Sequence, residues 1–136
     1  MTSDVENMEK SERVVAAILS QLMVWGIQDC ELVFEELQLP KEYEPFFFQC
    51  LRWLEAEGII RTSNITQFSD RSCKAINPVL TSFGIKALNQ SIKLVEGETK
   101  LADAVNQVSG GQKPYSNLGD FIGGLLGGFT KSIGSG

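Results

Sequence analysis

The chain has 136 residues, 43% of them hydrophobic and 21% charged, which is typical of one globular domain and not of a disordered chain. Its formal net charge is −5 and it contains no histidine, which excludes catalytic triads and metal sites that depend on an imidazole. Three widely separated cysteines predict neither a disulfide framework nor a metal centre. We therefore expect no cofactor and no metal.

Motifs of the common enzyme classes are also missing from the sequence. It has no Walker loop, no dinucleotide-binding glycine motif after a strand and no nucleophile elbow. The acidic, polar start does not have the features of a secretory signal, and no apolar run is long enough to span a bilayer. These observations predict a non-enzymatic, cytoplasmic protein.

The first predicted element is a helix that begins at Ser11 and ends at Gly26, preceded by a mobile leader over residues 1–10. Apolar residues at three- and four-residue intervals form one stripe along this helix. The stripe consists of Val14, Val15, Ile18, Leu19, Leu22 and Met23.

Two further helices are predicted before the middle of the chain. The first covers residues 30–38, with Asp29 as its cap. The second covers residues 41–58, with Pro45 in its first turn and Gly58 just beyond its end. The buried face of this third helix is expected to contain Phe47, Cys50, Leu51 and Leu54.

Two extended segments, residues 59–62 and 74–80, predict a β-hairpin around a polar loop over residues 63–72. Thr81 then predicts the cap of a fourth helix that extends to Ile92. A further short helix is expected over residues 97–108.

This order of elements resembles a winged helix-turn-helix domain over residues 11–92. Two local patterns carry the resemblance: LRWLEAEGII at residues 51–60 and LTSFGIKAL at residues 80–88. The resemblance implies a mainly α (α+β) domain of three to four helices with a short β-hairpin wing, and DNA as the default partner of the third helix. An unrelated small helical domain with a hairpin remains the alternative.

The charges oppose DNA binding. Residues 29–58 contain eight acids and two basic residues, a net charge of −6, which would repel a phosphate backbone. The expected wing offers Arg61, Arg71 and Lys74 against Asp70, and these three cations are the candidate nucleic-acid contacts. A DNA-binding regulator that uses the wing and a dimer is therefore the alternative function.

The third helix is rich in aromatic residues that one buried stripe cannot absorb. Three consecutive phenylalanines point about 100° apart, so at least one should lie at the edge of the core. We expect a partner-binding surface at Phe46, Phe48, Trp53 and Glu44. This predicts a protein-interaction or adaptor module with a protein partner or a second copy of the chain, unless the other helices cover every aromatic ring.

A glycine-rich tail is predicted over residues 110–136, which hold nine of the thirteen glycines, after a domain of residues 11–109 that contains the whole core. Gly119, Gly123 and Gly127 recur every four residues and would form a groove for another helix. Together with Phe121 and Phe129 they are the candidate residues for tail association. Self-association, contact with a membrane surface and a loosely packed tail all remain open.

Overall fold

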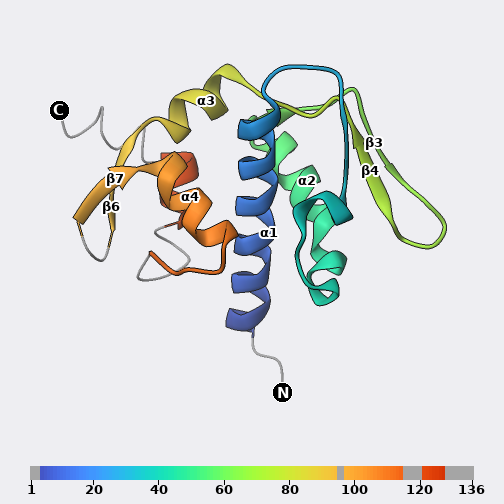
Figure 1. The fold of residues 1–136 in the computed structure, drawn as a ribbon, viewed down its shortest axis with the longest axis horizontal. Helices are drawn as coiled ribbons and strands as arrows, with labels where there is room; N and C mark the ends of the chain where they lie inside the picture. Colours follow the sequence, from blue (N-terminus) through green and yellow to red (C-terminus); the bar gives the residue numbers. More distant parts are fainter. Residues whose placement is uncertain (1–3, 95–96, 115–120, 128–136) are drawn as a thin grey trace.

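The computed structural model describes residues 4–94, 97–114 and 121–127, and these residues form a mixed α+β fold with small antiparallel sheets. Helix α1 (Asp4–Trp25) runs through the middle of the molecule (Figure 1). The elements that follow it directly lie on one side of α1, and those from the last third of the chain lie on the other.

Helix α1 begins at Asp4, so the predicted start at Ser11 is wrong and residues 4–10 are helical. The Ser11 hydroxyl donates a hydrogen bond to the backbone oxygen of Asn7 at 3.0 Å, a bond made inside a helix and not at a cap. Gly26 follows the helix at φ +71°, so the predicted end is confirmed. The predicted stripe is also confirmed: Val14, Val15, Ile18, Leu19 and Leu22 are buried, and Met23 packs against them.

The helix predicted over residues 30–38 is wrong. This segment forms strand β1 (Glu31–Val33) and a single 3-10 turn, η1 (Phe34–Leu37). Its residues alternate between exposed and buried from Glu31 to Glu35, which is the period of a strand. The strand forms because Leu32, fully buried, pairs with Ala75 far along the chain.

The third predicted helix is divided in two. Residues 41–46 form a 3-10 segment, η2 (Lys41–Phe46), which contains Pro45, and the α-helix proper is α2 (Phe47–Ala56). Gly58 lies just beyond α2 at φ +78°, a backbone conformation that favours glycine, and this confirms its predicted role. The predicted buried face is confirmed as Phe47, Cys50, Leu51 and Leu54.

The predicted hairpin is confirmed, but its strands are longer than expected. Strand β2 (Ile60–Arg61) pairs with β5 (Val79–Leu80), and strand β3 (Asn64–Gln67) pairs with β4 (Cys73–Ile76). Strand β3 occupies residues 64–67 of the segment expected to be a loop, so the turn covers only residues 68–72. Pairing with β4 therefore orders residues whose polarity alone predicted a loop.

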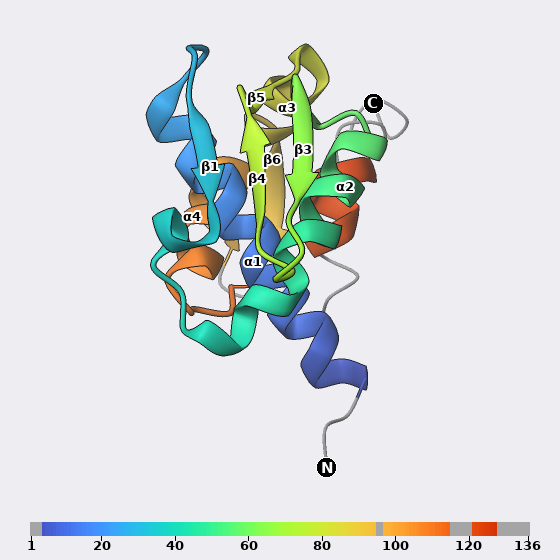
Figure 2. The ribbon, with the colours of Figure 1, turned by 90° about the vertical axis from the view of Figure 1, so that its right-hand side faces the viewer.

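Strand β4 is the centre of a three-stranded sheet with the order β1-β4-β3 (Figure 2). Cys73 and Ala75 of β4 are buried and face the core. Their partners on β3 are Gln67 and Ile65, and paired residues project from the same face of a sheet. The inner face of the hairpin is therefore apolar near its base and becomes polar at Gln67.

Helix α3 (Ser82–Leu88) follows the hairpin. Its predicted cap is confirmed, because the Thr81 hydroxyl accepts a hydrogen bond from the Gly84 N–H at 3.0 Å. The predicted extension to Ile92 is wrong, because the helix ends at Leu88. Ile92 instead belongs to a strand of the next hairpin.

The base of the β3–β4 hairpin is held on both sides. The Thr81 N–H donates to the backbone oxygen of Ile59 at 3.0 Å, and a Cβ on Gly84 would lie 2.3 Å from that oxygen. On the α2 side, one Glu55 carboxylate oxygen accepts bonds from the Thr62 N–H at 3.2 Å and the Thr62 hydroxyl at 2.7 Å. Helices α2 and α3 thus fix the hairpin where it leaves the core.

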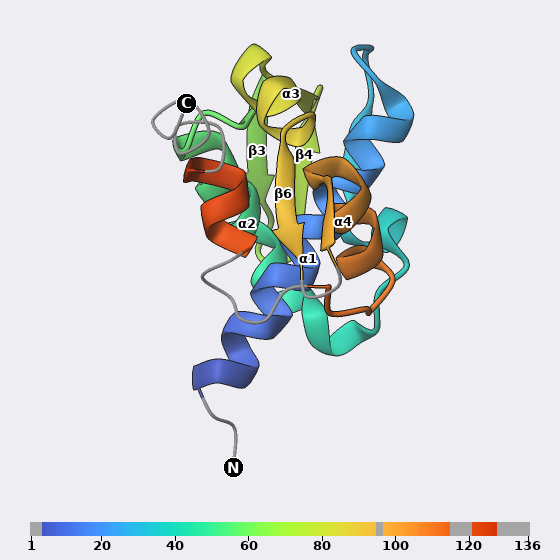
Figure 3. The same cartoon turned by 90° about the vertical axis from the view of Figure 1, so that its left-hand side faces the viewer.

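The last third of the chain packs on the opposite side of α1. Strands β6 (Ser91–Leu94) and β7 (Gly97–Lys100) form a hairpin, and α4 (Leu101–Ser109) packs along α1 (Figure 3). The helix predicted from residue 97 thus begins four residues later. Its predicted inward residues are confirmed as buried: Leu101, Ala104, Val105 and Val108.

The core extends beyond Ser109, so the prediction that every core residue precedes it is wrong. Phe121 is 0% exposed and Leu125 is 1% exposed, and both belong to the main apolar cluster. Leu125 lies in a turn of π-helix, η3 (Gly123–Gly127), which packs against α3. Burying these two side chains offsets the poor helix propensity of the surrounding glycines.

Candidate partner-binding groove

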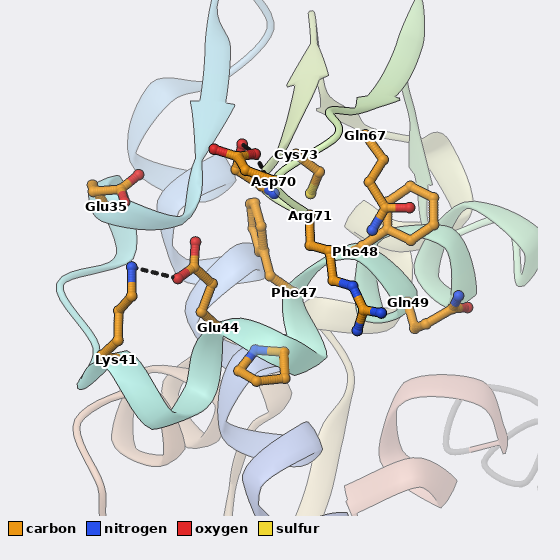
Figure 4. Close-up of a pocket in the computed structure, with 12 residues that line it drawn as sticks. Glu35, Lys41, Glu44, Phe47, Phe48, Gln49, Gln67, Asp70, Arg71 and Cys73 are labelled. Carbon is orange, nitrogen blue, oxygen red and sulfur yellow. Dashed lines mark hydrogen bonds and ion pairs between the residues drawn. The ribbon is translucent and has the colours of Figure 1, made fainter.

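A cavity of about 650 Å³ lies between the start of α2 and the tip of the β3–β4 hairpin, and we call it the hairpin groove (Figure 4). Its volume is within the range of ~300–1,000 Å³ that is common for ligand sites. The two 3-10 turns, the first turn of α2 and the hairpin all contribute to it. Its lining residues are Glu35, Lys41, Glu44, Pro45, Phe47, Phe48, Gln49, Gln67, Asp70, Arg71, Ser72 and Cys73.

The floor of the hairpin groove is apolar and chemically inert. Phe47 is 1% exposed and packs edge to face on Phe34, with ring centroids 5.8 Å apart. The neighbouring Cys73 is also buried. Burial, with a smaller contribution from the Glu44 carboxylate, raises the pKa of the Cys73 thiol to about 11. A raised pKa favours the neutral thiol at neutral pH, which adds to the apolar surface of the floor.

The rim of the groove carries both signs of charge. Lys41 Nζ lies 2.7 Å from Glu44 Oε1, and the hydrogen bond and charge of Glu44 raise the pKa of Lys41. Asp70 Oδ1 accepts bonds from the Ser72 hydroxyl at 2.6 Å and the Ser72 N–H at 3.0 Å, which lower the pKa of Asp70. With Glu35 and Arg71, the lining has three carboxylates against two cations, a net charge of −1.

Arg71 is positioned by the turn of the hairpin. Its φ is +73°, and its N–H donates to the backbone oxygen of Phe68 at 2.9 Å, which closes the turn. The side chain is exposed and extends from the turn toward the start of α2 (Figure 4). Within the described part of the chain, no carboxylate forms an ion pair with Arg71, so its charge is open to a ligand.

The structure divides the four predicted partner-binding residues into two pairs. Phe48 and Glu44 line the hairpin groove, and the Arg52 guanidinium lies 5.7 Å from the centre of the Phe48 ring. Phe46 and Trp53 are half-buried against the core and do not line the groove. The expectation that one of three consecutive phenylalanines lies at the core edge is confirmed by Phe46 and Phe48.

The three predicted nucleic-acid contacts do not form one patch. Arg71 lines the hairpin groove, whereas Arg61 lines a separate cavity of about 390 Å³ at the base of the hairpin. Lys74 projects from the outer face of the sheet, where its Nζ lies 3.4 Å from Glu31 and 5.9 Å from the ring centre of Phe68. Each cation therefore faces a different surface.

Of the predicted tail-association residues, Phe121 is buried inside the domain. A Cβ on Gly123 would meet no atom within 4 Å, whereas a Cβ on Gly124 would lie 3.1 Å from Leu101 Cδ1. The close approach that glycine permits is thus made within the chain, at Gly124. Gly127 ends the described segment, and Gly119 and Phe129 lie outside the described residues.

A second cluster of charged groups joins α1 to the segment after α4. Lys113 forms an ion pair with Glu9, and the Arg13 guanidinium donates to the backbone oxygen of Ser109 at 3.3 Å. Glu12 is half-buried beside them. Burial, and to a smaller extent the Glu9 carboxylate, raise its pKa to about 7, while Lys113 acts in the opposite direction.

Most of the groove residues have no signal in the sequence. Glu35, Gln49 and Gln67 belong to three different elements and meet only because the hairpin folds over the start of α2. The Ser-Asp sequence before Arg71 is the exception, because such residues favour turns and place the hairpin tip.

Comparison with known proteins gives no further assignment: no family model, curated protein or solved structure matches the chain. Across residues 4–94, 97–114 and 121–127, no three histidine, cysteine or acidic side chains gather in a way that could hold a metal ion. In the same residues, no helix is long and apolar enough to cross a membrane.

Proposed function

We propose that this protein is a non-enzymatic interaction module that binds a segment of a partner polypeptide in the hairpin groove. One observation carries the proposal: an apolar floor at Phe47 and Cys73 lies beneath a polar rim of both charge signs. A polypeptide presents the same mixture of apolar, charged and backbone polar groups at short intervals. The inert Cys73 thiol supports binding over catalysis.

We further propose that residues 4–88 are a variant of the winged helix. The order α1, β1, α2, hairpin, α3 and the strand order β1-β4-β3 support this assignment. In this variant the short helix expected before α2 is replaced by β1 and the 3-10 turns η1 and η2. In this assignment α2 takes the place of the third helix and the β3–β4 hairpin that of the wing, and the hairpin groove lies between them.

DNA binding through the wing and a dimer has less support. A duplex needs several cations on one continuous surface, because its affinity comes largely from neutralised phosphates. Arg61, Arg71 and Lys74 face three surfaces, and Lys74 is paired with Glu31. The net charge of −1 in the groove would repel a phosphate that approached Arg71.

The proposal is tested by selecting peptides from a random twelve-residue library against the full-length protein. Gln49 is exposed and lines the groove, so Gln49→Trp fills the groove without removing a core contact. We expect selected peptides to lose at least tenfold in affinity to this variant. Gln107→Trp is the matched control, because Gln107 is an exposed glutamine on α4, outside the groove.

Two results would refute the proposal. The first is a library that yields no peptide specific for the folded protein. The second is a set of peptides whose affinity falls equally in the Gln49→Trp and Gln107→Trp variants. Submicromolar binding of random duplex DNA with a steep dependence on salt would instead support the DNA-binding alternative.

A further inference from the structure

Strand β3 is an edge of its sheet. Strand β4 has β1 on one side and β3 on the other, and within the described residues no strand pairs with the far side of β3 (Figure 2). An edge strand presents backbone N–H and C=O groups in the geometry that an extended peptide can join.

One hydrogen bond at the end of β3 establishes which of its backbone groups face outward. The Phe68 N–H donates to the backbone oxygen of Ser72 at 2.8 Å, so the backbone groups of Phe68 point toward β4. Because these groups alternate in direction along a strand, Thr66 and Asn64 also point toward β4. The N–H and C=O groups of Ile65 and Gln67 therefore point away from β4, toward the free edge.

The same edge borders the hairpin groove. Helix α2 and the hairpin are joined at the hairpin base, where Glu55 accepts two bonds from Thr62, and the groove lies between them toward the hairpin tip. Gln67 lines the groove on the hairpin side, and Phe48 and Gln49 line it on the α2 side (Figure 4). An extended chain in the hairpin groove could contact α2 and form hydrogen bonds to β3 at the same time.

The net charge of −1 in the groove favours a cationic ligand, although Arg71 on its rim opposes one. Both hydrogen bonds that Ser72 donates to Asp70 reach Oδ1, so neither of them occupies Oδ2. Glu35 forms no ion pair there, whereas Lys41 is paired with Glu44 at 2.7 Å. Two carboxylates, those of Glu35 and Asp70, are thus available beside the apolar floor.

We propose that the ligand is an extended basic peptide that adds to the sheet as a new strand beside β3. Its backbone bonds to the outward groups of Ile65 and Gln67. Residues i and i+2 of a strand point to the same face, so an apolar side chain covers Phe48 while a lysine or arginine two positions away reaches Asp70. The inference depends on the proposed function and specifies its ligand and its binding mode.

The test uses the full-length protein and the synthetic peptide Gly-Leu-Ser-Lys-Thr-Ser-Gly, which places leucine and lysine two positions apart. Two altered peptides accompany it, one with glutamate in place of lysine and one with every internal peptide nitrogen methylated. We expect each alteration to weaken binding at least tenfold, because the first reverses the charge and the second removes the backbone donors. Binding of the parent peptide should also slow amide hydrogen exchange of Ile65 and Gln67 at least tenfold.

A variant of the protein tests the same bonds from the other side. Gln67→Pro removes one outward N–H but no ladder bond, because that N–H points away from β4. It should weaken peptide binding at least fivefold more than Gln67→Ala, which shortens the same side chain but keeps the N–H. The methylated peptide needs no variant, so the inference stays testable if Gln67→Pro does not fold.

The results separate the two proposals. Equal binding of the methylated peptide, or unchanged exchange at Ile65 and Gln67, overturns strand addition. Failure of the parent peptide to bind overturns the stated ligand chemistry. The proposed function would still be supported if the random library yields other peptides that bind the protein but lose affinity for the Gln49→Trp variant. Failure of both the parent peptide and the library overturns the proposed function as well.

Discussion

Replacing Phe121 by alanine should destabilise the whole domain, although this residue lies in a glycine-rich segment. Phe121 is 0% exposed and packs in the main apolar cluster with Leu125. Truncation of a fully buried phenylalanine costs about 3–5 kcal/mol, and a domain of this size is stable by only about 5–15 kcal/mol. The variant should therefore lose roughly a fifth or more of its stability.

The measurement is urea unfolding followed by tryptophan fluorescence and by circular dichroism. We expect the midpoint to fall with little change in slope. Gly123→Ala is the control in the same segment, because its new Cβ would meet no atom within 4 Å. By helix propensity this control should gain up to about 0.8–1 kcal/mol. Gly124→Ala should gain less, because its Cβ would lie 3.1 Å from Leu101 Cδ1.

An unchanged midpoint in Phe121→Ala would refute this reasoning. It would mean that the segment contributes nothing to the core in solution and that the domain ends near Ser109, as its glycine content suggests. If fluorescence and circular dichroism gave different unfolding midpoints, the segment would unfold separately from the rest of the domain.

Gly84→Ala should destabilise the domain by about 1–3 kcal/mol in thermal melts, since its Cβ would lie 2.3 Å from the Ile59 oxygen; an unchanged melting temperature would contradict that close approach. The pKa of Glu12 is raised to about 7 in the folded protein, from an ordinary value of 4.5, so the folded state disfavours the ionised carboxyl. The free energy of unfolding should therefore fall as the pH rises from about 4.5 to 7. Glu12→Gln should lose much of that slope in urea titrations, and an identical slope in both proteins would rule Glu12 out as its source. Random duplex DNA at physiological salt should bind no tighter than the roughly 10⁻⁴–10⁻⁶ M typical of non-specific contacts, as measured by mobility shift.

The sequence predicts best the helices whose apolar residues form one continuous stripe. The stripes of α1 and α2 are both confirmed, because packing on a core requires that spacing. Strand β1 was missed because Val33 and Leu37 also fit helical spacing, and the strand depends on a partner, Ala75, that local sequence does not reveal.

The part of the core beyond Ser109 was not predicted for a related reason. A high glycine content indicates low local helix propensity, but it does not reveal that Phe121 and Leu125 are buried in the core. The candidate site was predictable only in part, at Phe48, Glu44 and Arg71. Gln49 and Gln67 could not be found, because a glutamine acquires a role only from what the fold places beside it.

The anchoring of the hairpin at Thr81 and Thr62 has a consequence for the thermodynamics of binding. Because α2 and α3 already fix the hairpin base, one wall of the groove needs no ordering when a partner arrives. A preformed site avoids the entropy loss of coupled folding, so association rates should lie near the ordinary 10⁵–10⁷ M⁻¹s⁻¹. The heat-capacity change on binding should then be small and reflect mainly the apolar surface buried at Phe48, because Phe47 is already only 1% exposed.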